Sequence, residues 1–253
     1  MTARTPDGPP PPPTVQRLRI RYAKRGRLRF TSHRDFARSF ERSLRRAAVP
    51  MAYSAGFSPH PKISYANAAP TGTASDAEYL EIGVAERCDP GLVLARLDEA
   101  LPAGLDIIEV VEAAPGALAD LLEASRWEIR LPALAASDVR CAVEAFLAAD
   151  EVLVERLTKN GLRSFDARGP VLTAEVRDPA EAADAADEER PCAILDLVVR
   201  HVTPSVRPDD VLSALLRVAD LAPPVPPLVT RLAQGPLDAA TCTVGDPLAP
   251  VPT

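Results

Sequence analysis

Four side chains in the first third of the chain could do acid–base chemistry: His33, His60, Lys62 and Tyr65. Imidazole changes its charge close to neutral pH, and an ammonium or a phenol can donate a proton or bind phosphate. We take these four as candidate catalytic residues without assigning a reaction to them. For His33 a simpler explanation stays open, because its neighbours Ser32 and Asp35 have the spacing of a helix cap.

His60 and Lys62 belong to the segment YSAGFSPHPKISY, residues 53–65. Gly56 permits an unusual backbone angle, and the two flanking prolines hold His60 in an extended conformation. This rigid display predicts a ligand-contacting loop made of Ser54, Gly56, Phe57, Pro59, His60 and Pro61. The alternative is a purely structural loop in which His60 is an exposed polar residue.

Positive charge is concentrated around these residues. Residues 15–65 hold thirteen Lys and Arg but only two acids, a net charge of +11, whereas the remaining 16 basic and 33 acidic residues give −17. Guanidinium groups match phosphate oxygens and stack on bases, so the block predicts a surface for nucleic acid. The expected contact residues are Arg17, Arg19, Arg21, Arg27, Arg29, Arg34, Arg38, Arg42, Arg45, Arg46 and Lys62. Two alternatives remain: an acidic protein surface, including this chain's own acidic part, and a solvated face without a partner.

A strand and a helix are expected to position these arginines. Residues 17–22 alternate apolar and basic side chains, which predicts a half-buried strand that resumes after a turn at residues 24–27. Residues 31–48 form an expected helix, with a capping box at its start, an apolar stripe at i+4 spacing and Pro50 beyond its end. The arginines would then stand on the open face of the strand and opposite the apolar stripe of the helix.

The whole chain divides into two blocks that repeat one order of elements: strand, helix, strand, strand, helix, strand. In the second block, strands are expected at 127–131, 152–157, 193–202 and 228–233, with helices at 137–149 and 208–219. This order predicts an α+β protein made of tandem ferredoxin-like (split βαβ) units, with antiparallel sheets and helices on one face. The expected boundaries are a disordered proline-rich lead at 1–14, units at 15–112 and 125–234, a linker at 113–124, an acidic insertion at 178–190 and a disordered tail at 235–253.

Several classes of function have no support in the sequence. The cysteines Cys88, Cys141, Cys192 and Cys242 are scattered and have no histidine nearby, so we expect no metal or iron–sulfur centre. No Walker-type or dinucleotide-type glycine loop occurs, and we expect no cofactor. No apolar run is long enough to span a membrane, and the N-terminal segment is not a secretory signal. We therefore expect a cytoplasmic location.

The stretch from Arg17 to Ile82, with SHRDF, then RR, then YSAGFSPHPKISYA, resembles the radical-SAM-associated (radical-SAM-linked) protein family, a domain of unknown function. The segments KNG and FDARGPV, within residues 159–171, are similar to the same family. Within that family, the chain resembles the stand-alone proteins of actinobacteria, which are not fused to an enzyme. The resemblance implies a role in RNA processing, RNA modification or ribosome biogenesis beside a separately encoded radical-SAM enzyme or ribonuclease E/G. The chain lacks the CxxxCxxC motif of a radical-SAM core.

A looser similarity connects the basic tandem to CRISPR repeat-processing endoribonucleases, which cleave RNA without metal. It implies His33, His60, Lys62 and Tyr65 as an acid–base set, although the glycine-rich C-terminal loop of that group is missing. The sequence therefore predicts an RNA-binding accessory protein. The alternatives are a metal-independent endoribonuclease or RNA-modifying enzyme, and a docking module for a radical-SAM enzyme or ribonuclease.

Overall fold

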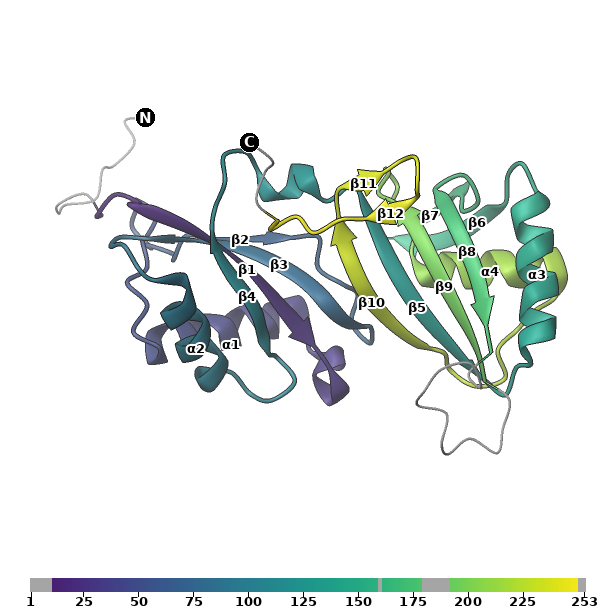
Figure 1. Ribbon diagram of the computed structural model, residues 1–253, viewed down its shortest axis with the longest axis horizontal. Coiled ribbons are helices and arrows are strands. Elements are labelled where there is room, and N and C mark those ends of the chain that lie inside the picture. Colours follow the sequence, from purple (N-terminus) through teal and green to yellow (C-terminus); the bar gives the residue numbers. More distant parts are fainter. Residues whose placement is uncertain (1–10, 159–160, 179–191, 250–253) are drawn as a thin grey trace. The chain divides into compact units, whose positions relative to one another are not determined.

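The computed structural model describes residues 11–158, 161–178 and 192–249. The chain is a mixed α+β protein whose strands pair mostly antiparallel, with four α-helices in the described ranges (Figure 1). It separates into an N-terminal unit, Met1–Asp120 with Leu248–Thr253, and a C-terminal unit, Leu121–Pro247. Each unit has its own hydrophobic core.

The N-terminal unit contains four strands and two α-helices. Its elements are β1 (Gln16–Lys24), the short 3-10 helix η1 (Gly26–Phe30), α1 (His33–Arg46), β2 (Ile63–Ala66), β3 (Ala74–Val84), α2 (Pro90–Ala100), β4 (Ile107–Glu112) and the 3-10 helix η2 (Leu118–Leu121). Within this unit the strands follow the order β4-β1-β3-β2, and all three pairings are antiparallel.

The alternation in β1 has the predicted effect on the core. Leu18 and Ile20 are fully buried and pack with Phe40 of α1 and Leu97 of α2, so both helices cover the same face of the sheet (Figure 1). The intervening side chains, from Arg17 to Arg21, point to the opposite face, which we call the open face. The predicted start of α1 is also confirmed: the backbone N–H of Asp35 donates to Ser32 Oγ, which caps the helix.

The segment after β1 differs from the expectation. Residues 26–30 form η1 instead of a resumed strand. Gly26 has a positive φ of 54°, a conformation that glycine adopts readily and that turns the chain out of the sheet. Arg27 and Arg29 therefore do not extend the row of β1.

The C-terminal unit has the same kinds of element in a similar order. Its elements are β5 (Ala124–Pro132), α3 (Ala136–Ala148), β6 (Leu153–Thr158), β7 (Gly161–Asp166), β8 (Val171–Arg177), β9 (Cys192–Arg200), α4 (Pro208–Ala219), β10 (Leu228–Gly235), β11 (Leu237–Asp238) and β12 (Thr243–Val244). The main sheet follows the order β10-β5-β9-β8. Phe146 of α3 and Leu215 of α4 pack in one core with this sheet.

One predicted strand in this unit has a different place. The segment expected at 152–157 is β6, which pairs with β7 in a separate two-stranded sheet, while β8 lies beside β9 in the main sheet. The hairpin buries Val154 and Phe165 against the core but leaves Leu157 and Leu162 exposed, so it packs through one face only. Its apolar residues predicted a strand, but not the sheet to which that strand belongs.

The predicted end segments also differ in part. The stretch after residue 235 was expected to be a disordered tail, but β11 pairs with β12 there and Leu248 is buried. The stretch 113–124, expected as a linker, contains η2 and the first residue of β5. The acidic insertion at 178–190 lies outside the described residues except for Asp178.

Candidate nucleic-acid interface

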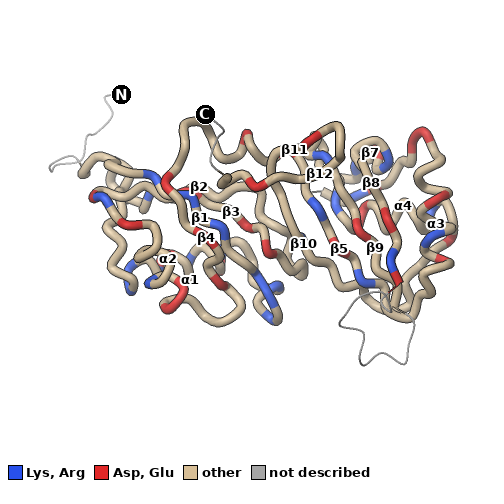
Figure 2. Tube along the Cα trace, viewed as in Figure 1, with Lys and Arg blue, Asp and Glu red and all other residues tan. Residues whose placement is uncertain are grey.

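The helix α1 carries five basic side chains on its solvent side. Phe36, Phe40 and Leu44 are buried, which turns the opposite side of the helix to solvent. Because an α-helix rotates by about 100° per residue, the basic positions fall together on that side. We call it the arginine face of α1; it consists of Arg34, Arg38, Arg42, Arg45 and Arg46, all of them exposed. Figure 2 colours the basic and acidic positions along the chain trace, α1 included.

The arginine face has little opposing charge. In the parts of the chain that the structure describes, none of its five guanidiniums forms an ion pair. The helix itself contributes only Asp35, whose carboxylate accepts a hydrogen bond of 2.7 Å from Ser32 Oγ, and Glu41. Like charges this close on one helix repel each other, so the surface is suited to an anionic ligand.

The strand arginines have a different environment. Arg19 is only 2% exposed; its Nε donates to Glu81 Oε2 at 3.2 Å, and its Nη2 donates to the carbonyl oxygens of Ala114 and Gly116. The prediction that Arg19 binds a surface ligand is therefore wrong, because its donors are used inside the unit. Arg17 remains largely exposed and lies 3.5 Å from Glu81 Oε1.

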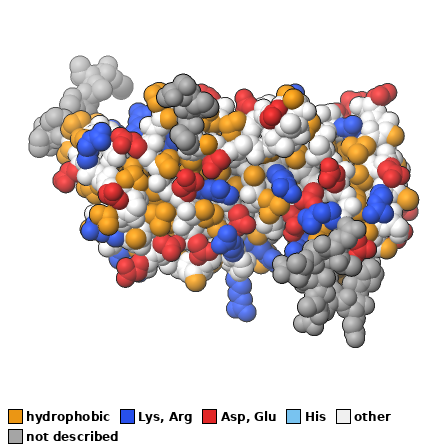
Figure 3. Space-filling model, viewed as in Figure 1, with side chains coloured by type: hydrophobic (Ala, Val, Ile, Leu, Met, Phe, Trp, Pro, Cys, Tyr) orange, Lys and Arg blue, Asp and Glu red, His pale blue; other side chains and the backbone are white. Residues whose placement is uncertain are grey.

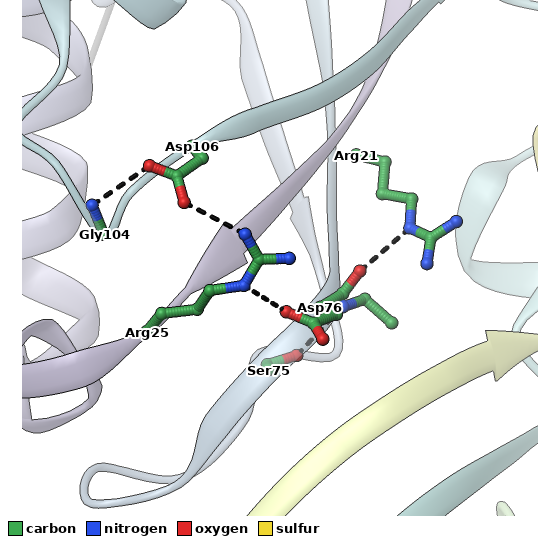
Figure 4. A network of polar contacts seen from close by, with 7 residues as sticks. Arg21, Arg25, Ser75, Asp76, Gly104 and Asp106 are labelled. Atoms are coloured by element: carbon green, nitrogen blue, oxygen red, sulfur yellow. Dashed lines mark hydrogen bonds and ion pairs between the residues drawn. The ribbon is translucent and has the colours of Figure 1, made fainter. Parts of the chain in front are cut away.

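A second internal network lies at the far end of β1 (Figure 4). Arg21 Nε donates to the carbonyl oxygen of Asp76 at 2.9 Å, and Arg25 contacts the carboxylates of Asp76 and Asp106 at 2.7 and 3.1 Å. The hydrogen bond to Asp76 is the largest cause that raises the pKa of Arg25. Arg21 is half-buried and uses one donor in this network, so its role in nucleic-acid binding stays a prediction. Around β1 and β4, acidic and basic side chains lie next to one another on the face drawn in Figure 3.

The arginines of η1 lie beside an exposed aromatic ring. Arg27 is exposed, and the guanidinium carbon of Arg29 lies 4.8 Å from the centroid of the Phe30 ring. Phe30 itself is 60% exposed, which is unusual for so large an apolar side chain. The sequence analysis did not single out Phe30, because a strand at this place would have buried it.

The predicted ligand loop is the tip of a small hairpin. Tyr53 and Pro61 form an isolated antiparallel bridge, and the backbone N–H of Ser54 donates to the carbonyl oxygen of His60. At the tip, Gly56 has a φ of 134°, Pro59 and His60 are exposed, and Phe57 is 69% exposed. The loop therefore presents an aromatic ring and an imidazole to solvent.

Two of the four candidate acid–base residues come together. The rings of His33 and Tyr65 meet edge-on with centroids 4.8 Å apart. The Tyr65 hydroxyl is buried and has no hydrogen-bond partner among the described residues. Burial, followed by the nearby Glu41 carboxylate, raises the pKa of Tyr65, so its phenol stays protonated at neutral pH.

Lys62 belongs to a different surface. Successive side chains of a strand alternate, and Ile63 and Tyr65 pack against the core beneath the helices, which directs Lys62 to the open face. There its ammonium donates to Thr14 Oγ1 at 2.9 Å. The backbone N–H of His60 donates to Ser54 Oγ at the base of the hairpin. The predicted acid–base set is thus divided among three places: His33 with Tyr65 next to α1, His60 in the hairpin, and Lys62 on the open face.

Glu81 is, after Phe30, a second residue of this region that the sequence did not single out. It sits between the buried Leu80 and Ile82 of β3 and faces Arg19 across the sheet. The signal in the sequence is an acid between two apolar residues of a strand, because such an acid points to the face opposite theirs.

Residues 11–158, 161–178 and 192–249 also bear on metal binding and membrane spanning. No group of three or more His, Cys, Asp or Glu side chains is arranged to hold a metal ion there. None of the helices in those ranges is both long and apolar enough to cross a membrane.

A comparison with models of protein families relates the chain to one of them. A family model described as an uncharacterized protein conserved in bacteria matches residues 17–208. This range includes α1, the hairpin between Tyr53 and Pro61, and β5 of the C-terminal unit. No curated protein matches the chain.

Proposed function

The chain belongs to the DUF2344 family of uncharacterized bacterial proteins, and we propose that this member is a cytoplasmic RNA-binding accessory protein that uses the arginine face of α1. The observation that carries the proposal is the set of five exposed guanidiniums without an ion pair in the described part of the chain. One guanidinium group can donate two parallel hydrogen bonds to the oxygens of one phosphate, and an RNA strand offers one phosphate per nucleotide. RNA would relieve the repulsion along the helix.

The exposed aromatic rings favour single-stranded over double-stranded RNA. Of the eleven aromatic residues, only Phe30, Tyr53 and Phe57 are among the exposed large apolar side chains, and all three are close in sequence to α1. Unpaired bases stack on such rings, whereas the bases of a duplex are not accessible to them. Phosphate contacts by α1 and stacking on Phe30 or Phe57 would together hold a single strand.

We also propose that each unit has the ferredoxin-like (split βαβ) arrangement. The strand orders β4-β1-β3-β2 and β10-β5-β9-β8 support it, since in both the third strand lies between the first and second. The resemblance to radical-SAM-associated proteins supports a role in RNA processing, RNA modification or ribosome biogenesis. The catalyst in this proposal is a separately encoded radical-SAM enzyme or ribonuclease.

RNA binding is tested by fluorescence anisotropy with a labelled single-stranded RNA at low salt. The double variant Arg38→Glu/Arg42→Glu is expected to bind about 10- to 100-fold more weakly, because two phosphate contacts are lost and two repulsive charges are added. Arg140→Glu/Arg217→Glu is a matched control, since it makes the same charge change at exposed positions of α3 and α4. Equal losses in both variants, or none in either, would contradict the proposed surface.

An enzymatic function is a second candidate because His33 and Tyr65 are in contact. A protonated Tyr65 could donate a hydrogen bond, and His33 would be the base. Purified protein in EDTA is then expected to cut single-stranded RNA, and His33→Ala is expected to stop the cutting. Cutting that persists in His33→Ala, or its absence in the unmodified protein over a broad RNA pool, would reject this candidate.

The docking alternative predicts a different partner for the same helix. A protein partner captured through α1 would stay bound after nuclease treatment and would be lost in Arg38→Glu/Arg42→Glu. An RNA-dependent capture would instead support the RNA-binding proposal.

A further inference from the structure

A cavity of about 540 Å³ opens at the edge of the N-terminal sheet. It lies beside β2 and β3, and its wall includes Arg17, Lys62, Ser64, Glu81 and Gly83, which belong to the open face. The short stretch Ala117, Leu118 and Ala119 forms the remaining side. Cavities of a few hundred to about 1,000 Å³ are the usual size for small-molecule sites.

The charges in this cavity leave an excess of positive charge. Glu81 is the one carboxylate in the wall, and the buried Arg19 holds it through a hydrogen bond of 3.2 Å. Since Arg19 already compensates Glu81, the longer contact of 3.5 Å from Arg17 is not needed to neutralise that carboxylate. Arg17 is 68% exposed and can turn towards a ligand.

Lys62 supplies a second cation in the same wall. Its ammonium donates one hydrogen bond, to Thr14 Oγ1, so two of its three donors remain for a ligand. Two cations at one cavity match a phosphate group, which carries nearly two negative charges at neutral pH.

The rest of the wall suits an uncharged body larger than phosphate. A Cβ atom added at Gly83 would lie 3.0 Å from Thr14 Cγ2 and 3.4 Å from Lys62 Cβ, so glycine at this position lets Thr14 and Lys62 pack directly against β3 in the wall. Ser64 offers a hydroxyl, and the stretch Ala117, Leu118 and Ala119 offers apolar contact. The wall thus combines a cationic part with a neutral one.

We propose that this cavity binds a small phosphorylated molecule about the size of a nucleoside monophosphate, with its phosphate between Arg17 and Lys62. The site lies on the open face, whereas the arginine face of α1 belongs to a helix that covers the other face. The inference therefore does not depend on RNA binding by α1.

Isothermal titration calorimetry of the full chain tests the site. The probes are the four ribonucleoside monophosphates, glucose 6-phosphate, the unphosphorylated nucleosides and inorganic phosphate. At least one phosphorylated organic probe is expected to bind about 10-fold more tightly than the same molecule without its phosphate, and about 10-fold more tightly than inorganic phosphate. A preference for nucleotides or for the sugar phosphate then shows which uncharged group the rest of the cavity accepts. Lys62→Ala and Arg17→Ala are each expected to weaken that binding about 10-fold.

Arg140→Ala is the control, because it removes an exposed cation from α3 and is expected to leave the affinity of the small molecule unchanged. Circular dichroism melting checks that each variant is folded. The proposal is overturned if no phosphorylated probe binds at about 1 mM, if inorganic phosphate binds equally well, or if both wall variants keep full affinity. Loss of RNA binding in Arg38→Glu/Arg42→Glu with unchanged nucleotide binding would show that the two proposals stand or fall separately.

Discussion

The strand β1 and the helix α1 are neighbours in sequence and equally rich in arginine, but their guanidiniums have opposite environments. In β1 and just beyond it, Arg19 binds Glu81, and Arg25 binds Asp76 and Asp106. These carboxylates come from β3 and from the residue before β4, more than fifty positions away. The arginine face of α1 has no ion pair in the described residues.

The difference follows from what surrounds a strand and what surrounds a helix. A central strand has a neighbour on each side, so a charged side chain on it meets side chains of remote segments at short distance. An amphipathic helix turns its polar side away from the core and meets only solvent. A basic run in a sequence therefore becomes a basic surface only where the fold keeps acids away, and here that place is α1.

The largest expected effect is the loss of stability when the buried Arg19 of β1 is removed. Arg19→Ala leaves Glu81 and two backbone carbonyls without their donor, so the free energy of unfolding is expected to fall by about 3–5 kcal/mol. Arg38→Ala on α1 is expected to change it by less than about 0.5 kcal/mol. Urea denaturation measures both, and similar values for the two variants would remove the distinction between strand and helix arginines.

The next effect concerns the exposed aromatic rings. Phe30→Ala/Phe57→Ala is expected to weaken single-stranded RNA binding, because each stacked base contributes about 1–3 kcal/mol. The same change is expected to leave the free energy of unfolding nearly unaltered, since both rings are largely exposed. Anisotropy measurements with single- and double-stranded RNA of one sequence make the comparison; an unchanged preference between them would rule out stacking.

A smaller effect is expected at the partly exposed network of Figure 4. Asp76→Asn removes the carboxylate that contacts Arg25, and the free energy of unfolding is expected to fall by about 0.2–1 kcal/mol at low salt. In about 1 M NaCl the difference should disappear, because the Debye length falls to about 3 Å, close to the separation of the two charges. A loss that is independent of salt would show that Asp76 acts through packing.

The smallest effect is expected at Tyr65. Its hydroxyl is buried without a partner in the described residues, so Tyr65→Phe is expected to change the free energy of unfolding by no more than about 1 kcal/mol, and in the stabilising direction. Burial, with Glu41, raises the pKa of Tyr65, and the tyrosinate absorbance at about pH 10 should therefore be the same in both proteins. A smaller absorbance in the variant would mean that this phenol ionises normally.

Local features of the sequence predicted local structure well. The alternation from Arg17 to Tyr22 predicted both the strand β1 and its buried side, and Ser32 with Asp35 predicted the first turn of α1. Both depend on residues within a few positions of each other, which a single sequence contains. Exposure of the helix arginines followed from the same short-range periodicity.

Features that depend on remote segments could not be predicted in the same way. The sequence does not state that Arg19 meets Glu81, because the register between β1 and β3 depends on the packing of both strands. For the same reason it could not separate Lys62, the residue before β2, from Tyr65 in β2, although their side chains point to opposite faces of the sheet. The sequence also does not state whether β6 or β8 lies beside β9, because either strand could pair with it. In the structure β8 takes that place, and β6 pairs with β7 in a separate hairpin.

The most direct test of the account is the salt dependence of single-stranded RNA binding. Each phosphate contact adds about 0.7 to the slope of log affinity against log salt, so Arg38→Glu/Arg42→Glu should have a slope about 1.4 smaller in magnitude than the unmodified chain. Arg140→Glu/Arg217→Glu should keep the original slope. An unchanged slope in the α1 variant, or an equal decrease in both variants, would contradict the claim that the arginine face of α1 binds the RNA backbone.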